Sequence, residues 1–138
     1  MKMSKSDLTP NAVVSVLDSP EEIVKKFKKA VTDSDTTIAF DPDNKAGISN
    51  LLTILAVASG QSIEKATQDC QGLRYGDLKM RVADSVVEML RPFRSKYDQL
   101  MQDEEYLIDV AREGALKAET LGEPVLRRFK KAIGYVVL

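Results

Sequence analysis

One apolar stripe at helical spacing constrains the fold of this chain more than any other feature of its sequence. The stripe keeps its period for about six turns, through Leu78, Val82, Val86, Met89, Phe93, Tyr97 and Leu100. An apolar residue at every third or fourth position marks one face of an amphipathic α-helix. Pro92 lies inside the stripe and is expected to kink or interrupt the helix, because proline removes a backbone hydrogen bond. The stripe therefore predicts a long helix from about Gly76 onward.

Residues suited to helix ends recur along the rest of the chain. They are Ser19, Pro20 and Glu22 as a capping box, Gly60 as a C-terminal cap, and Ser62 and Asp103 as N-terminal caps. The almost wholly apolar run 48–59 predicts a central buried helix, and Pro124 is expected to restart the last helix. The sequence therefore predicts an all-α fold, a bundle of about six helices preceded by an N-terminal loop.

Composition narrows the chemistry that is open to this chain of 138 residues. It contains no histidine, which removes the usual general base and the commonest zinc ligand. The single cysteine, Cys70, is expected to be a small buried residue in a reducing compartment. No apolar run approaches the roughly 20 residues that span a bilayer. We therefore expect a soluble intracellular domain with no catalytic constellation of its own.

A surface for nucleic acid must come from local clusters, since 20 basic and 21 acidic residues give a net charge of -1. The clusters are Lys25, Lys26, Lys28 and Lys29; Arg127, Arg128, Lys130 and Lys131; and Arg91, Arg94 and Lys96. Each could contact phosphates, but a lysine-rich helix face is usually only solvated, and cations also stabilise a helix C-terminus. Stacking on single-stranded bases would suit Tyr75, Tyr97, Tyr106 and Arg94, although packing is the preferred role of each tyrosine.

The stretch Asp41-Pro42-Asp43-Asn44-Lys45 superficially suggests a calcium loop. Counting from Asp41, however, its sixth position is Ala46 and its twelfth is Leu52, where such a loop needs glycine and glutamate. The stretch is therefore predicted to be a turn.

The N-terminal stretch KMSKS comprises Lys2, Met3, Ser4, Lys5 and Ser6. Two lysines three residues apart can reach one polyanion, and the two hydroxyls add short donors. These groups would suit a triphosphate or pyrophosphate, whose developing charge they would stabilise without a covalent step. On residue chemistry alone, a disordered lysine-rich tail left over from cloning is favoured over a binding loop, because chain termini are usually disordered.

This stretch is identical to the signature loop of the class I aminoacyl-tRNA synthetases. The run from Ser6 to Ser34, with its ending AVTDS, resembles the tryptophanyl family within that class. FDPDNKAGISNLLTIL (40–55), SGQSIE (59–64) and YGDLK (75–79) are similar to the helical-domain pattern of the same family. The resemblance covers essentially the whole chain.

The resemblance implies that Lys2 and Lys5 grip the phosphates of ATP, accompanied by Mg²⁺, and stabilise the departing pyrophosphate. Met3, Ser4 and Ser6 would complete the ATP-binding loop. It further implies tRNA(Trp), ATP and tryptophan as partners of the intact enzyme, which would be a cytoplasmic homodimer, or one of the mitochondrial matrix if organellar. Residues 1–17 would be the loop and linker of a missing catalytic domain, and 18–138 the anticodon-binding helical domain.

Because the Rossmann half with its histidine-containing motif is absent, we expect a C-terminal part that is inactive and monomeric alone. Two alternatives stay open. One is a helical interaction module without enzymatic role, in which KMSKS is incidental. The other is part of a tyrosyl-type synthetase, which fits the loop equally well but the AVTDS and GISNLL stretches less well.

Overall fold

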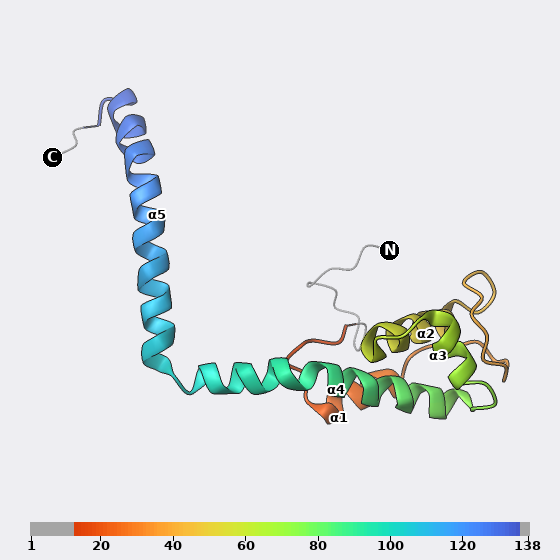
Figure 1. The fold of residues 1–138 in the computed structure, drawn as a ribbon. Helices are drawn as coiled ribbons and strands as arrows, with labels where there is room; N and C mark the ends of the chain where they lie inside the picture. The colour runs from red at the N-terminus through yellow and green to blue at the C-terminus, as the bar shows by residue number, and fades with distance from the viewer. Residues whose placement is uncertain (1–12, 136–138) are drawn as a thin grey trace. The chain divides into compact units, whose positions relative to one another are not determined.

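The computed structural model describes residues 13–135 and holds five α-helices in that range (Figure 1). They are α1 (Pro20–Lys28), α2 (Ala46–Ser59), α3 (Ile63–Asp69), α4 (Tyr75–Met101) and α5 (Glu104–Ala132). The described residues form no strand. The predicted all-α class is therefore confirmed, with five helices in place of about six.

The difference in helix count arises at proline. Pro92 lies inside α4 and Pro124 inside α5, and both helices continue through them. Proline leaves the carbonyl of the residue four positions earlier without its helical partner. Both prolines lie on exposed faces, where water can satisfy that carbonyl. The expected restart at Pro124 was therefore wrong, and Pro92 does not interrupt its helix.

The helix ends follow the capping residues of the sequence. The Ser19 hydroxyl accepts the Glu22 N–H and the Glu22 carboxylate accepts the Ser19 N–H, which completes the predicted capping box of α1. Gly60 ends α2 with a φ of 66°, a left-handed conformation that glycine adopts without strain. Ser62 caps α3 and Asp103 caps α5, each by accepting a backbone N–H. These four caps are confirmed.

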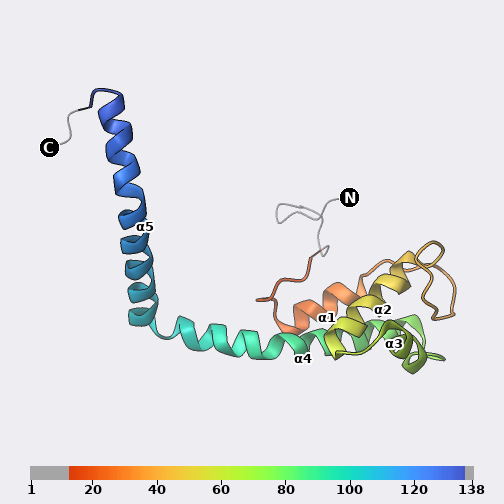
Figure 2. The same cartoon turned by 45° about the horizontal axis from the view of Figure 1, so that its top comes forward.

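The chain divides into two units, Met1–Arg94 and Ser95–Leu138. In the first unit, α1, α2 and α3 gather around the N-terminal part of α4 (Figures 1 and 2). Their buried side chains form one core: Ile23, Phe27, Ile38, Ile48, Leu51, Leu52, Leu55, Ala56, Ala66, Cys70, Leu78, Val82, Ala83 and Val86. Cys70 is fully buried in this core, as predicted, and burial raises the pKa of its thiol.

The second unit comprises the end of α4 and the whole of α5. None of the 29 residues of α5 is buried. Its apolar side chains, among them Leu121, Val125 and Phe129, are exposed. The hydrophobic core of the described residues therefore lies entirely in the first unit.

Among the described residues, no single helix is long and apolar enough to cross a membrane. Only α2 and α3 taken together pass by length and composition, and they are bent by 105° at the break between them.

Candidate nucleic-acid interface

The predicted ATP-binding loop lies outside the described residues. Lys2, Met3, Ser4, Lys5 and Ser6 all precede residue 13, where the described chain begins. In the described part of the chain, a turn at residues 15–18 precedes α1.

That turn is closed by Asp18. Its backbone N–H donates to the Ser15 carbonyl, and its carboxylate accepts the Ser15 N–H at 2.8 Å. Lys26 of α1 donates to the same carboxylate oxygen, Oδ2, at 2.5 Å. Burial alone would raise the pKa of Asp18, but the hydrogen bonds from Lys26 and Ser15 outweigh it, and the charges of Lys26 and Arg94 add to them. The pKa of Asp18 therefore lies below its ordinary value.

The Asp18 ion pair leaves three of the four lysines of the first basic cluster exposed. Lys26 is half-buried and committed to Asp18, whereas Lys25, Lys28 and Lys29 are exposed. Positions 25, 28 and 29 are three and four residues apart, so the three ammonium groups lie on one face at the end of α1. Such a face can contact successive phosphates of a nucleic-acid backbone.

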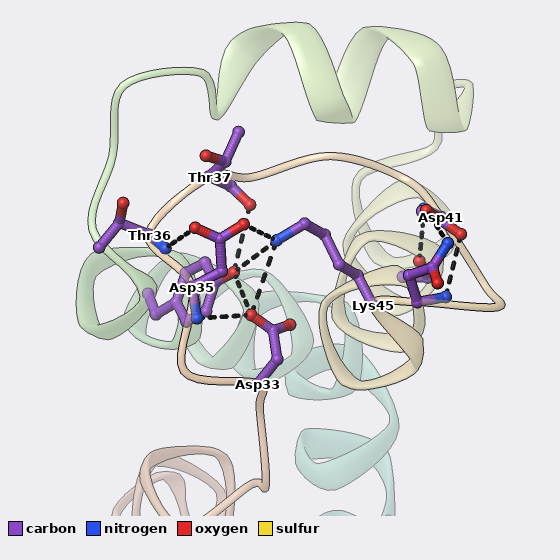
Figure 3. A network of polar contacts seen from close by, with 9 residues as sticks. Asp33, Asp35, Thr36, Thr37, Asp41 and Lys45 are labelled. Atoms are coloured by element: carbon purple, nitrogen blue, oxygen red, sulfur yellow. Dashed lines mark hydrogen bonds and ion pairs between the residues drawn. The ribbon is translucent and has the colours of Figure 1, made fainter.

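The most developed polar site of the described chain joins the 33–37 connection to the starts of α2 and α4 (Figure 3). The Tyr75 hydroxyl donates to Asp33 Oδ1 at 2.7 Å and lies 3.2 Å from the Thr37 carbonyl oxygen. Lys45 donates to Asp35 Oδ2 at 2.5 Å and to the Tyr75 hydroxyl at 3.3 Å, and its ammonium lies 3.6 Å from Asp33 Oδ1. We call Asp33, Asp35, Lys45 and Tyr75 the polar clamp.

The electrostatics of the polar clamp favour its charged carboxylates. The hydrogen bond from Tyr75 lowers the pKa of Asp33, and the hydrogen bond from Lys45 lowers that of Asp35. The Asp35 hydrogen bond also raises the pKa of Lys45. Burial and the bond to Asp33 raise the pKa of Tyr75 above its ordinary 10.0. At neutral pH the clamp therefore holds two carboxylates, one ammonium and a neutral phenol.

The clamp continues into the predicted turn at Asp41. The Asp41 carboxylate accepts the backbone N–H groups of Asp43 and Asn44, and the Asn44 side-chain amide at 2.8 Å. The Asp41 N–H donates to the hydroxyl of Ser49, which is buried in α2. The turn is thus confirmed, and its carboxylate oxygens are taken up by the chain itself. The described residues contain no group of three or more metal-ligating side chains.

The aromatic candidates fall into two classes. The Tyr75 ring packs against the core and its hydroxyl donates a hydrogen bond within the polar clamp. Tyr75 therefore has the packing role that the sequence analysis preferred. The rings of Tyr97 and Tyr106 are exposed to roughly half of their area and remain open to stacking on bases. Arg94 is half-buried, and its charge acts on Asp18.

The remaining basic residues lie on helix faces that are exposed, except that Lys130 is half-buried. Arg91 pairs with Glu88 at 2.9 Å and Arg127 with Glu123 at 3.2 Å, both within one helix. Lys130 and Lys131 lie in the last turn of α5, where positive charge also favours the helix dipole. These residues can serve helix stability and phosphate contact at once.

Comparison with known proteins decides the family. The sequence model described as "tRNA synthetases class I (W and Y)" matches residues 1–91, which include both KMSKS and the polar clamp. The chain belongs to this family.

The relatives of this synthetase chain carry a more specific name. A tryptophan–tRNA ligase of Oceanobacillus iheyensis and one of Bacillus anthracis are each 44% identical to it over 133 residues, 96% of the chain. The crystal structure of tryptophanyl-tRNA synthetase from Mycoplasma pneumoniae superposes on 99% of the chain with a TM-score of 0.65 and 27% identity. The chain spans 40% of the length of these curated relatives and 43% of the solved chain.

Sequence reasoning missed the polar clamp of this synthetase chain. It gave Asp33 and Asp35 no role and placed Lys45 only in the predicted turn that begins at Asp41. The one sequence signal for the clamp is that two aspartates, Asp33 and Asp35, lie close together, within and just after the AVTDS stretch. No spacing rule links these residues to Tyr75, which lies 42 residues beyond Asp33.

Proposed function

We propose that this chain is the part of a tryptophan–tRNA ligase that carries the ATP-gripping loop and the tRNA-binding helical domain. The observation that carries the proposal is 44% identity to tryptophan–tRNA ligases across 96% of the chain. In the whole enzyme, tryptophan and ATP would form tryptophanyl-adenylate, and the tryptophanyl group would then pass to tRNA(Trp). The names of these relatives favour tryptophan over tyrosine within a family that covers both.

In this proposal Lys2 and Lys5 bind the phosphates of ATP and stabilise the charge that develops on pyrophosphate as it leaves. Ser4 and Ser6 would add short donors, and Mg²⁺ would accompany ATP as part of the substrate. Neither lysine can place the carboxylate of tryptophan against the α-phosphate, which is the work of a binding pocket elsewhere in the whole enzyme. We therefore propose that the chain alone is inactive, and that the whole enzyme is a cytoplasmic or mitochondrial homodimer.

The catalytic part of the proposal is tested in a chimera. This chain replaces the matching 40% of the Oceanobacillus ligase, and tryptophan-dependent exchange of pyrophosphate into ATP is measured. We expect an active chimera, in which Lys5→Ala lowers the exchange rate roughly 10²- to 10³-fold. Lys65→Ala is the matched control, since Lys65 is an exposed lysine of α3. Equal rates for the two variants, or exchange by the chain alone, would contradict the proposal.

The tRNA-binding part is tested with the chain itself. A transcript of tRNA(Trp) and one with a substituted anticodon are titrated at two salt concentrations. Base readout by this domain predicts that substitution costs about 1–3 kcal/mol of binding free energy. Equal, steeply salt-dependent binding of both would leave only backbone contact by exposed lysines such as Lys25, Lys28 and Lys29.

Failure of the chain to bind either transcript, together with an inactive chimera, would favour the alternative of a helical interaction module without enzymatic role. That alternative has no specific support among the described residues.

A further inference from the structure

The chain that leads from the ATP-gripping loop into α1 is attached to the first unit at several successive points. Val14 packs against the hydrophobic core. The Asp18 N–H donates to the Ser15 carbonyl, and the Asp18 carboxylate accepts the Ser15 N–H. Ser19 then begins the capping box of α1. Residues 14–19 therefore have a defined position on the helices of the first unit.

Asp18 holds this stretch to α1 through a single carboxylate oxygen. Its Oδ2 accepts both the Ser15 N–H at 2.8 Å and the Lys26 ammonium at 2.5 Å. The side chains of Asp18 and Lys26 are only 14% and 21% exposed, so salt screens this pair less than a pair at the open surface. One side chain thus closes the turn and joins it to the helix that follows.

Arg94 of α4 brings a second positive charge to Asp18. The charge of Arg94 acts on the Asp18 carboxylate, and its Nε and Nη2 atoms are buried without a hydrogen-bond partner among the described residues. Asp18, Lys26 and Arg94 all belong to the first unit. Because cations from two helices depend on one carboxylate, loss of the Asp18 charge would leave both uncompensated and loosen the stretch at this point.

The attachment limits where the lysines of the loop can reach. Lys5 precedes Val14 by nine residues, and a chain of that length spans at most about 30 Å when fully extended. A catalytic group displaced by about 1 Å can lose roughly a hundredfold in rate. The attachment of residues 14–19 therefore bears on how accurately Lys5 meets the departing pyrophosphate.

We propose that Asp18 and Lys26 are positioning residues for the ATP-gripping loop: their ion pair fixes the chain that follows the loop on the helical domain, and with it the reach of Lys5. Both residues act through Lys5 and not by contact with ATP. This role rests on the proposed function, in which Lys5 stabilises the pyrophosphate as it leaves. It is separate from any contact of the α1 lysines with tRNA.

The test measures tryptophan-dependent pyrophosphate exchange by the chimera at varied ATP and without tRNA. Asp18→Asn keeps an acceptor for the Ser15 N–H but removes the charge, and Lys26→Met keeps the side-chain stem. Each should lower kcat roughly tenfold and change KM for ATP less than about twofold, because Lys5 acts mainly in the transition state. Lys26→Arg retains the charge and should keep at least about half of kcat.

Asp69→Asn is the matched control. Asp69 is also an aspartate of the first unit paired with a lysine, Lys65 of α3, at 3.7 Å, but it lies far along the sequence from the loop. Its substitution should change kcat less than about twofold. Urea unfolding checks that every variant is folded at the assay temperature.

Coupling to Lys5 separates a positioning role from a general structural defect. In the Lys5→Ala background, Asp18→Asn should lower kcat by less than a further factor of about two, because the lysine that it positions has been removed. A defect that acts elsewhere would lower kcat by the same factor in both backgrounds and would overturn the positioning role.

The outcomes also distinguish this role from the proposed function. If Lys5→Ala slows exchange but Asp18→Asn and Lys26→Met behave like Asp69→Asn, the positioning role is wrong and the proposed function stands. An inactive chimera, or equal rates for Lys5→Ala and Lys65→Ala, contradicts the proposed function and the positioning role with it.

Discussion

At the scale of single residues, the polar clamp shows how a connection without secondary structure is held in place. Asp33 and Asp35 belong to the connection, Lys45 is the N-cap residue of α2, and Tyr75 is the first residue of α4. Tyr75 contributes both a ring that packs on the core and a hydroxyl that binds Asp33. A single side chain thus couples the connection to the hydrophobic core.

Removing the Tyr75 hydroxyl should weaken this coupling without creating a cavity. We expect Tyr75→Phe to lower the free energy of unfolding by about 1 kcal/mol, because Asp33 loses a charge-assisted hydrogen bond while the ring keeps its packing. Urea unfolding at pH 7 measures the change. Tyr97→Phe is the control, since its exposed ring takes part in no described hydrogen bond; an equal loss in both variants would refute the role of the clamp.

The pKa shifts of the clamp predict the pH dependence of stability. The pKa values of Asp33 and Asp35 lie below the ordinary 3.8, so their stabilising effect is present above that pH and is lost as pH falls through the folded values. The pKa of Tyr75 is raised, so its contribution persists up to pH 10.0 and is lost above it.

Urea unfolding is measured about every half pH unit between about pH 2.5 and pH 7. The free energy of unfolding should fall below about pH 4. The double variant D33N/D35N should show a shallower fall than the unmodified chain. Asp98→Asn replaces an exposed carboxylate outside the described ion pairs. It should leave the fall of the unfolding free energy at low pH unchanged. A D33N/D35N profile parallel to that of the unmodified chain would mean that other carboxylates govern acid unfolding.

At the scale of helices, local sequence decides where each helix begins and ends. Where another backbone segment lies close to a helix, the space between them decides which side chain the helix tolerates. Gly47 in the first turn of α2 illustrates the second point. A β-carbon placed there would lie 2.4 Å from the Val31 carbonyl oxygen. The backbone of the connection therefore reaches α2 only because residue 47 has no side chain.

Two glycine substitutions near helix starts should have opposite effects. Gly47→Ala should destabilise the chain by roughly 1–3 kcal/mol, because a backbone carbonyl has to move. Gly76→Ala in α4 meets nothing within 4 Å and should stabilise the chain by up to about 1 kcal/mol. Thermal and urea unfolding measure both; destabilisation by Gly76→Ala would show that the space around residue 76 is smaller than described.

At the scale of the whole molecule, the hydrophobic core and the second unit differ in what they contribute. All fourteen buried apolar residues of the described chain lie at or before Val86, within the first unit. The second unit adds a long helix with none. Global stability should therefore depend on the first unit.

Matched truncations of leucine test this division. Leu52 is fully buried in α2, whereas Leu121 of α5 is mostly exposed. Leu52→Ala should cost about 2–5 kcal/mol of unfolding free energy. Leu121→Ala should change it by less than about 0.5 kcal/mol. Equal losses from the two variants would contradict this division.

The sequence by itself determined the helical class, the caps at Ser19, Gly60, Ser62 and Asp103, the buried cysteine and the turn at Asp41. The caps and the turn depend on side chains within a few residues of one another, so local spacing carries the information, whereas the burial of Cys70 was predicted from its residue type. The family was also evident from contiguous stretches such as KMSKS and AVTDS. The role of Lys2 and Lys5 stays a prediction, since both lie outside the described residues.

Only the tertiary structure decided the rest. The continuity of α5 through Pro124 depends on whether water reaches the freed carbonyl, which is a property of exposure. The polar clamp joins residues up to 42 positions apart, and the commitment of Lys26 to Asp18 depends on the turn that precedes α1. Which cations remain available to a partner follows from these contacts, because helical spacing defines a face but not which of its side chains are already paired.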